Sequence, residues 1–484
     1  MLATGKDGRR AWPPSFLIKT LKRGIIGAEA LVKRVVPPLV TRTAAWNMPR
    51  LIAALAHLTM QNARLRRARS GRARWHVLLL PRSRFIEDSF QALSSLDNVS
   101  ASLLPRKTVK AIAAAFLPDE VDDNDYVSTS ADSREAMLRY REFLKRFWLA
   151  FDPRRKIHAV FTGNFGYYAE RELGAALEEL GIPFVALHKE NSWSPGTQSF
   201  WEKIYKDRRG PFHGRRILVY SPIERDLQLR SGVITEERVE VVGMARLDEV
   251  HQWRQLQAGL VPEPVVLFVS FHPDVSMPVL GIDEGSGWRV ALDERPQGRN
   301  LLEVCLTAHQ AMVELARLNP DITVFVKSKG RDRDLAILNE LLGVRDESEL
   351  PSNLKIVLGG SPLALLFQSA VVCGLHSTLL VEAIAAGRPV VMPWYGELTD
   401  PEIARFVFDL GTLAVKATSP DEFKTKVRSL ALARTPVPEA LDPDSSALLR
   451  EWVGNEDGRS GERTAAAILR VLEACPERAK QASR

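Results

Sequence analysis

The chain has 484 residues, 45% hydrophobic and 26% charged, a composition typical of a globular protein and not of a disordered tract or a fibrous repeat. Its three cysteines, Cys305, Cys373 and Cys475, are too few and too scattered for a disulfide framework or a zinc ribbon, which favours a reducing compartment. At about 150 residues per domain, the length is enough for two independent cores.

Positive charge is concentrated at the N-terminus. Residues 1–74 contain 16 Lys and Arg against only Asp7 and Glu29, whereas residues 75–484 contain 50 basic and 57 acidic residues. The rest of the chain therefore lacks the basic surface of a nucleic-acid-binding protein, and we expect no nucleic-acid partner. No window reaches the roughly 18 uninterrupted apolar residues of a bilayer span, and early lysines interrupt any secretory signal.

The basic N-terminal segment has an amphipathic pattern. Residues 16–36 predict a helix with apolar residues at three- and four-residue intervals and cations on the other side. Such helices are typical of anionic membrane surfaces, where each basic residue contributes about 1 kcal/mol. A cleavable targeting peptide, a nucleic-acid arm and a solvated tail are the alternatives, because glycines and Pro37 and Pro38 weaken the helix. We expect residues 1–74, with the apolar stretch 51–60, to be a basic amphipathic extension on the cytoplasmic face of the plasma membrane.

The first half of the remaining chain alternates between short β-branched runs and helical stretches. This alternation is typical of parallel sheets covered by helices. The predicted strands are Val77–Leu80, Ala159–Thr162, Phe184–Leu187, Ile217–Tyr220 and Val239–Val242.

A Pro-rich break at residues 259–264 precedes a second series of the same kind. We therefore expect an N-terminal Rossmann-like domain over 75–260 and a C-terminal one over 261–484. The predicted strands of the second series are Val265–Val269, Thr323–Val326, Lys355–Leu358, Val371–Gly374 and Pro389–Met392. The fold class predicted is α/β, with two doubly wound parallel-sheet domains.

The most specific segment follows the strand at 371–374. His376-Ser377-Thr378 leads into a helix, where Ser377 or Thr378 can cap the free amides and the positive end of the helix can bind a diphosphate. Glu382 lies one turn further along, where a carboxylate can accept hydrogen bonds from ribose hydroxyls. A plain helix–strand corner has the same pattern, and His376 is either a structural histidine or a donor to phosphate.

Residues 374–393, Gly-Leu-His-Ser-Thr-Leu-Leu-Val-Glu-Ala-Ile-Ala-Ala-Gly-Arg-Pro-Val-Val-Met-Pro, resemble the donor-binding segment of GT-B glycosyltransferases. The nearest resemblance is to relatives that build bacterial surface polysaccharides, including capsule-synthesis and glycerophosphotransferase-like proteins. The turn at 242–248 is similar to their Gly-x-Pro-Arg-x-Asp turn, with Ala245 in place of proline. The resemblance spans roughly residues 75–475 and is strongest in the last third. It implies two Rossmann-like domains facing across a cleft, with a nucleotide-sugar held mainly by the C-terminal one.

Three further residues of the second series are candidates, two for donor binding and one for catalysis. Lys327 and Lys329 follow the strand at 323–326, at the carboxyl end of a sheet, where ligands of open α/β folds bind. Either ammonium can neutralise a diphosphate leaving group, and a solvated lysine pair is the alternative. His272 follows the first strand of the second series and is a candidate phosphate contact or base, or else a loop histidine.

Candidates in the first series follow predicted strands as well. Gly163 and Asn164 form a tight turn that we expect to line the acceptor site, since the full dinucleotide-binding glycine spacing is missing. His188 or Glu190 can remove a proton from an acceptor hydroxyl, with a salt-bridged loop as the alternative. Arg246 either binds a phosphate or pairs with Asp248.

Together these features predict a GT-B glycosyltransferase that moves a sugar from a nucleotide-sugar to a lipid-linked or surface-polysaccharide acceptor. We expect no metal and no cofactor, because a helix terminus and lysines can carry the leaving-group charge. The alternatives are a nucleotide-sugar 2-epimerase or a glycerophosphotransferase of the same fold, and a non-catalytic nucleotide- or glycan-binding partner in polysaccharide assembly. Patterns for a serine nucleophile elbow, a Walker loop and a metalloprotease helix are absent.

Overall fold

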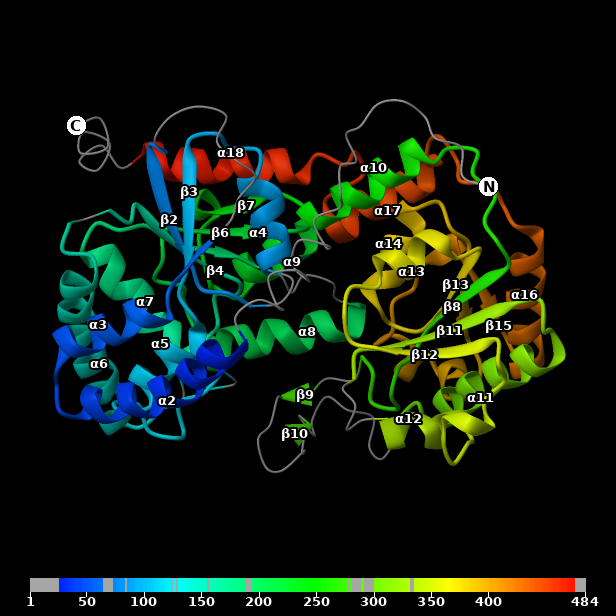
Figure 1. The fold of residues 1–484 in the computed structure, drawn as a ribbon, viewed down its shortest axis with the longest axis horizontal. Helices are drawn as coiled ribbons and strands as arrows, with labels where there is room; N and C mark the ends of the chain where they lie inside the picture. The colour runs from blue at the N-terminus through cyan, green and yellow to red at the C-terminus, as the bar shows by residue number, and fades with distance from the viewer. Residues whose placement is uncertain are drawn as a thin grey trace.

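The computed structural model describes most of the chain as two parallel sheets covered by helices (Figure 1). The part described comprises residues 26–63, 73–82, 85–123, 125–127, 129–154, 156–188, 194–276, 279–280, 289–290, 300–330 and 335–474. Side chains before Val36 lie outside it, as do Glu190, Cys475 and the predicted helix up to residue 25.

The first sheet has seven strands in the order β1-β3-β2-β4-β5-β6-β7. Its strands are β1 (Gln61–Ala63), β2 (Trp75–Leu79), β3 (Val99–Leu103), β4 (Ala159–Thr162), β5 (Phe184–Leu187), β6 (Arg216–Val219) and β7 (Val239–Val241). All neighbours pair in parallel except β1, which is antiparallel to β3. The five predicted strands are present, whereas β3, Val-Ser-Ala-Ser-Leu, was not predicted because its serines and alanine give little strand signal.

Side chains of β2 alternate between the two faces of this sheet, as the two-residue period of a strand requires. Trp75, Val77 and Leu79 pack with α4 (Phe85–Leu93) and α18 (Ser460–Glu473), whereas Leu78 joins the cluster formed by the helices on the opposite face. The helices around this sheet are α4 (Phe85–Leu93), α5 (Arg106–Ala113), α6 (Ala131–Phe151), α7 (Tyr168–Glu179), α8 (Pro195–Ile204) with the π-helical turn Tyr205–Arg209, and α9 (Pro222–Arg230).

The N-terminal helices differ from those that the sequence predicts. Helix α2 spans Ile26–Ala45 and continues through Pro37 and Pro38, where we expected weakening. Its second half is held by packing, since Val36, Val40 and Ala44 are buried in the same cluster as α5 and α6. Helix α3 (Pro49–Thr59) buries one side against α6 and leaves the other exposed. The apolar stretch 51–60 is therefore partly used inside the fold.

The second sheet has six strands in the order β12-β11-β8-β13-β14-β15, all paired in parallel. Its strands are β8 (Val265–Val269), β11 (Thr323–Ser328), β12 (Leu354–Leu358), β13 (Val371–Gly374), β14 (Val390–Pro393) and β15 (Ala414–Ala417). Its helices are α11 (Leu302–Leu318), α12 (Leu335–Leu342), α13 (Leu363–Gln368), α14 (Thr378–Ala385), α15 (Pro401–Ala404) and α16 (Pro420–Ala433). A two-stranded ribbon, β9 (Val279–Leu280) with β10 (Arg289–Val290), lies apart from both sheets.

In chain order the strands of the second sheet run 3-2-1-4-5-6, the Rossmann order, and those of the first sheet run 2-1-3-4-5-6 once the antiparallel edge strand is set aside. Both orders place the earliest parallel strand inside the sheet, with later strands added on either side. This confirms the predicted fold class of two doubly wound parallel-sheet units.

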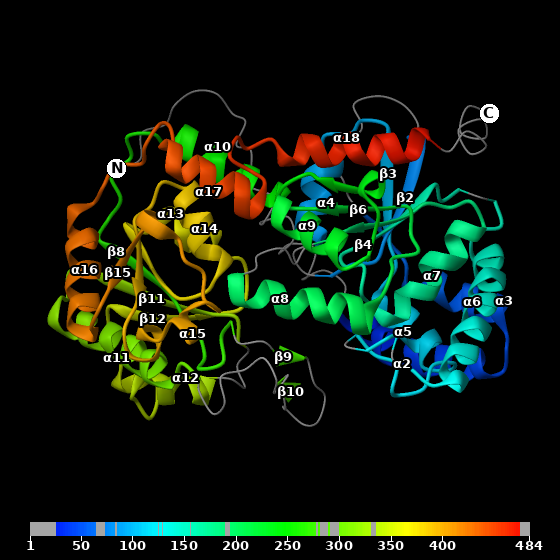
Figure 2. The same ribbon diagram turned by 180° about the vertical axis from the view of Figure 1, so that it is seen from behind.

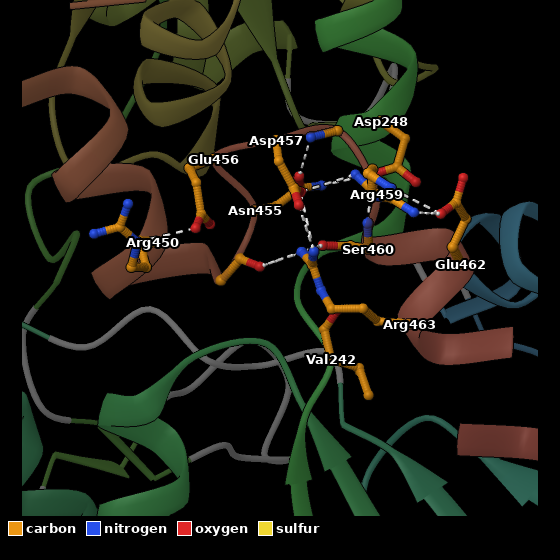
Figure 3. A network of polar contacts seen from close by, with 12 residues as sticks. Val242, Asp248, Arg450, Asn455, Glu456, Asp457, Arg459, Ser460, Glu462 and Arg463 are labelled. Carbon is orange, nitrogen blue, oxygen red and sulfur yellow. Dashed lines mark hydrogen bonds and ion pairs between the residues drawn. The ribbon is translucent and has the colours of Figure 1, made fainter. Parts of the chain in front are cut away.

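Three segments connect the two sheets. Helix α8 runs from one toward the other in both views (Figures 1 and 2), and α10 (Asp248–Leu256) leads from the first sheet into the second. After α17 (Pro443–Val453), helix α18 (Ser460–Glu473) returns to the first sheet and packs against α4. The return is held by Asp248, whose carboxylate accepts from the backbone amides of Ser460 and Gly461 at 3.0 and 2.7 Å (Figure 3).

Candidate functional site

Three basic side chains gather at the carboxyl ends of neighbouring strands in the second sheet. His272 follows β8, Lys329 follows β11 and His376 follows β13, and β8 lies between the other two strands. Lys329 is exposed, and its charge contributes to lowering the pKa of both histidines, after the larger effect of burial. The structure thus brings together the predicted donor-site residues Lys329 and His376 and the candidate base or phosphate contact His272, at a place where an anionic ligand can bind.

His376 is held in a defined orientation. Its backbone has a φ of 46°, in the left-handed region that few residues other than glycine adopt. The ring lies on Phe408, with centroids 3.8 Å apart, and Nδ1 accepts from the Phe408 backbone N–H at 3.2 Å. Burial, and to a lesser extent Lys329, lower the pKa of His376 to about 3, so the ring is neutral at pH 7. Since Nδ1 accepts, the proton lies on Nε2, which can donate to a ligand.

Helix α14 begins directly after His376. Ser377 caps it by accepting from the Leu379 backbone N–H at 3.3 Å, and Thr378 is its first residue, half-buried. Before them, Gly374 leaves no room for a side chain, because a Cβ would lie 2.7 Å from the Val269 carbonyl oxygen. The start of the helix is therefore held close to the centre of the sheet.

Glu382 is buried on α14 and faces a residue from the other half of the chain. Its Oε1 lies 3.9 Å from Nε of Arg246. Nη1 of Arg246 donates to Asp88 Oδ2 and Tyr220 Oη at 2.9 and 2.7 Å. Burial would lower the pKa of Arg246, but Tyr220, Asp88 and Glu382 together raise it above its ordinary value. Arg246 therefore stays charged and connects the first sheet to the predicted donor helix.

Arg246 does not pair with Asp248, one of its two predicted roles. Its ion-pair partner is Asp88 at the start of α4, whose other oxygen accepts the Arg246 backbone N–H at 2.9 Å. Asp248 is turned toward Asn455 and the start of α18 instead. Each member of the expected local pair thus has a partner far away in the chain, Asp88 for Arg246 and Asn455 for Asp248.

Lys327 is buried, in contrast to Lys329. Its Nζ donates to the backbone carbonyls of Ser328 and Gly359 at 2.8 and 2.6 Å. These bonds join the ends of β11 and β12. The Lys327 ammonium thus holds the ends of these two strands together, next to His272, Lys329 and His376.

His188, at the end of β5, lies beside a carboxylate that the sequence pattern did not indicate. Its Nε2 is 3.0 Å from Oε1 of Glu224, and both side chains are fully buried. Glu224 also accepts from Gln228 Nε2 at 2.7 Å and Tyr205 Oη at 3.2 Å. The pattern Ser-x-x-Glu at 221–224, a capping signal, could have indicated the start of α9 but not its proximity to His188.

The predicted acceptor turn follows β4. Gly163 allows close packing, since a Cβ there would lie 2.8 Å from Phe85 Cβ. Asn164 is buried, and its Oδ1 accepts from the Gly166 backbone N–H at 2.7 Å. The turn therefore has a fixed shape at the carboxyl edge of the first sheet.

Two kinds of special site are missing from the described residues. Nowhere in that part of the chain do three His, Cys, Asp or Glu side chains come together as a candidate metal site. None of the described helices is long and apolar enough to cross a bilayer.

Comparison with known proteins finds no matching family model and no matching curated protein. Solved structures do align. The wall teichoic acid polymerase TagF is 10% identical, with 96% of this chain and 99% of that chain covered and a TM-score of 0.47. The UDP-GlcNAc 2-epimerase from Methanocaldococcus jannaschii is 13% identical, with 82% and 99% covered and a TM-score of 0.44. S. aureus MnaA with UDP is 11% identical, with 82% and 97% covered and a TM-score of 0.44. The likeness is one of architecture and assigns no activity to this chain.

Proposed function

We propose that this protein is a GT-B-type glycosyltransferase that moves a sugar from a nucleotide-sugar to a lipid-linked or surface-polysaccharide acceptor. The observation that supports it most is the meeting of His272, Lys329 and His376 beside the capped start of α14. A group that leaves with two phosphates needs positive charge and N–H donors at this kind of place.

The donor would lie with its diphosphate against these groups. Nε2–H of His376 and the Lys329 ammonium would donate to the phosphate oxygens, and the first amides of α14 would add their dipole. Glu382 would accept hydrogen bonds from the ribose hydroxyls while it remains in its ion pair with Arg246. When the bond between the anomeric carbon and the diphosphate breaks, the negative charge stays on the nucleoside diphosphate, where these groups stabilise it.

The acceptor hydroxyl would lose its proton to His188. The Glu224 carboxylate, 3.0 Å from Nε2, would fix the orientation of the imidazole. His272 belongs to the donor side, next to Lys329, and is assigned a phosphate contact. In this arrangement the second half of the chain would stabilise the leaving group, and the first half would activate the acceptor hydroxyl.

We further propose that α2 and α3 rest on an anionic membrane surface. Five apolar side chains of these helices and their connecting loop are at least two-fifths exposed: Leu39, Trp46, Met48, Leu51 and Leu58. Arg42 and Arg50 are exposed on the same two helices. An apolar face flanked by cations is the combination that interfacial helices use.

A nucleotide-binding screen tests the donor site. The full chain is heated with UDP, GDP, CDP, ADP or CMP, and a ligand at 100 times its dissociation constant is expected to stabilise the folded state by about 2.7 kcal/mol. The shift should vanish in His376→Ala and Glu382→Ala and persist in Lys355→Ala, an exposed residue of the same sheet. Absence of any shift from a folded protein contradicts the proposal.

The reaction is then tested with the sugar derivatives of the nucleotide that binds. Release of nucleoside diphosphate that depends on a glycan or lipid acceptor supports a transferase. Isomerisation of the free nucleotide-sugar would show an epimerase instead, transfer of a phosphoalcohol would show a glycerophosphotransferase, and binding without turnover would show a non-catalytic partner.

A further inference from the structure

The carboxyl ends of β2, β3 and β4 carry a second cluster of cations, far in sequence from the donor site. Strand β2 lies between β3 and β4 in the sheet. Arg82 follows β2, Arg106 follows β3 and Tyr167 follows β4. The strand order reverses at β2, because β3 is added on one side of it and β4 on the other, and such switch points are where open parallel sheets bind ligands.

The two guanidinium groups share one aromatic ring. Cζ of Arg106 lies 3.5 Å from the centroid of Tyr167, and Cζ of Arg82 lies 4.9 Å from it. The ring stabilises both cations, which would otherwise repel each other at this spacing. We call Arg82, Arg106 and Tyr167 the arginine–tyrosine cluster.

The cluster has more positive charge than nearby carboxylates neutralise. Arg106 forms an ion pair with buried Glu170, which also accepts from Thr162 Oγ1. Asp123 contributes at longer range, but it lies 3.8 Å from Lys110. Within the described residues the exposed Arg82 has no ion-pair partner, and the buried Nη2 of Arg106 has no hydrogen-bond acceptor. One positive charge and one buried donor are therefore available to a ligand.

The predicted acceptor turn lies directly beside this cluster. Gly163 and Asn164 come between β4 and Tyr167, and their turn is fixed by the hydrogen bond that the Gly166 N–H donates to Asn164. An acceptor placed against this turn would bring its own charged groups to the two arginines. Guanidinium groups match the paired oxygens of a phosphate or a carboxylate, and such charge-assisted bonds are about twice as strong as neutral ones.

We propose that the arginine–tyrosine cluster binds an anionic group of the acceptor, a phosphoryl or a carboxylate group. The role as acceptor subsite rests on the proposed transferase function, whereas anion binding itself does not. After β2, β3 and β4 the sequence pattern indicated only Gly163 and Asn164, and the two arginines add a requirement for charge to the acceptor.

Binding of small anionic probes to the full chain tests the proposal. Farnesyl phosphate is compared with farnesol, and methyl glucuronide with methyl glucoside, by isothermal titration calorimetry. Each anionic probe carries the proposed group, and its neutral partner lacks it. Preference for the phosphate pair would indicate a lipid phosphate as the source, and preference for the carboxylate pair an acidic sugar.

Arg82→Gln is the main variant, because Arg82 is exposed and its loss leaves Glu170 paired. We expect it to weaken binding of the preferred anion at least tenfold, the loss of one charge-assisted contact. Lys107→Gln removes an exposed cation from the same helix as Arg106 and should leave the affinity unchanged. Arg106→Lys keeps the charge and should weaken binding less than Arg82→Gln, if the fold is retained by circular dichroism.

Two results would overturn the proposal: equal affinities for the anionic and neutral probes, or equal losses in Arg82→Gln and Lys107→Gln. Lys329→Gln separates this site from the donor site, since an anion bound at the donor site would be lost in Lys329→Gln and kept in Arg82→Gln. If Arg82-dependent anion binding persists in a protein that transfers no sugar, the cluster stands and the transferase function fails.

Discussion

Burial lowers the pKa of two histidines in the second half of the chain, one in the candidate site and one in the core. His376 belongs to the candidate site, with a pKa lowered to about 3 by burial and by Lys329. His309 is part of the core, where burial lowers its pKa to about 4 although the Cys305 carbonyl favours the protonated form. Its other nitrogen lies 2.9 Å from Ser270 Oγ. In the unfolded chain both rings take up a proton near the ordinary value of 6.5.

The protein should therefore lose stability as the pH falls below 6.5. The unfolded state binds more protons than the folded one between the two pKa values, so its free energy drops by at most about 1.4 kcal/mol per pH unit for each histidine. Urea unfolding at a series of pH values measures this slope. His309→Gln should flatten it, whereas Ser270→Ala should lower stability without changing it. An unchanged slope in His309→Gln would contradict the assignment.

At the level of elements, α8 joins the two sheets at the place where His376 is held. Ser194 Oγ donates to the Phe406 carbonyl at 2.8 Å, and the Gly196 N–H donates to the Arg405 carbonyl at 2.8 Å. Two residues after Phe406, Phe408 contacts His376. The segment 405–408 therefore binds the start of α8 and also orients His376, the candidate donor-site histidine.

Replacing Gly196 of α8 by a larger residue should disturb the contact between α8 and segment 405–408. A Cβ at Gly196 would lie 2.7 Å from Cδ1 of Phe406, so Gly196→Val forces the helix or the ring to move and should cost about 1–3 kcal/mol of stability. Ser199→Val places the same side chain on an exposed position of α8 and controls for helix propensity. Urea unfolding compares the two variants. Equal stabilities would show that the contact between α8 and the second sheet does not hold the helix.

A buried carboxylate caps the helix with which the chain returns to the first sheet. Asp248 accepts from two amides at the start of α18 and from Asn455 Nδ2 (Figure 3). Asp248→Ala removes this cap and should destabilise the protein by about 1–2 kcal/mol and speed hydrogen exchange in α18. Asp457→Ala, which removes the half-exposed ion pair with Arg463, should cost less than about 1 kcal/mol. Equal effects of the two substitutions would contradict the capping role.

At the scale of the whole molecule, α2 and α3 pack against α5 and α6 of the first sheet's half and carry exposed apolar side chains. If this surface rests on a membrane, the protein should sediment with vesicles that contain phosphatidylglycerol and less with phosphatidylcholine alone. Binding should weaken with salt, because screening reduces the attraction of the cations for the lipid headgroups.

The double variant Trp46→Ser and Leu58→Ser should reduce vesicle binding, since these side chains are 71% and 68% exposed. Leu256→Ser is the matched control, because Leu256 is 72% exposed on α10 and outside the proposed surface. A similar loss in both proteins would show that exposed apolar residues in general, and not this surface, cause the binding.

Strands with strong patterns could be predicted, whereas weak strands and long-range contacts could not. Val265–Val269 and Val371–Gly374 are apolar runs buried in a parallel sheet, and their bounds agree with the prediction. Strand β3 has little β-branched character and forms because β1 and β2 pair with it. In the candidate site, the capping role of Ser377 could be predicted from local sequence, but the contact of Arg246 with Asp88 joins residues far apart in the chain.

Sequence patterns alone were enough to predict the fold class, the positions of most strands along the chain and the points at which polar residues follow them. These features depend on periodicity and on capping, which act over a few residues. The packing of the folded chain buries Lys327 while Lys329 stays exposed, and it places Glu224 beside His188. It also decided that two arginines share Tyr167. Such contacts depend on which strands become neighbours in the sheet, and no local pattern records that choice.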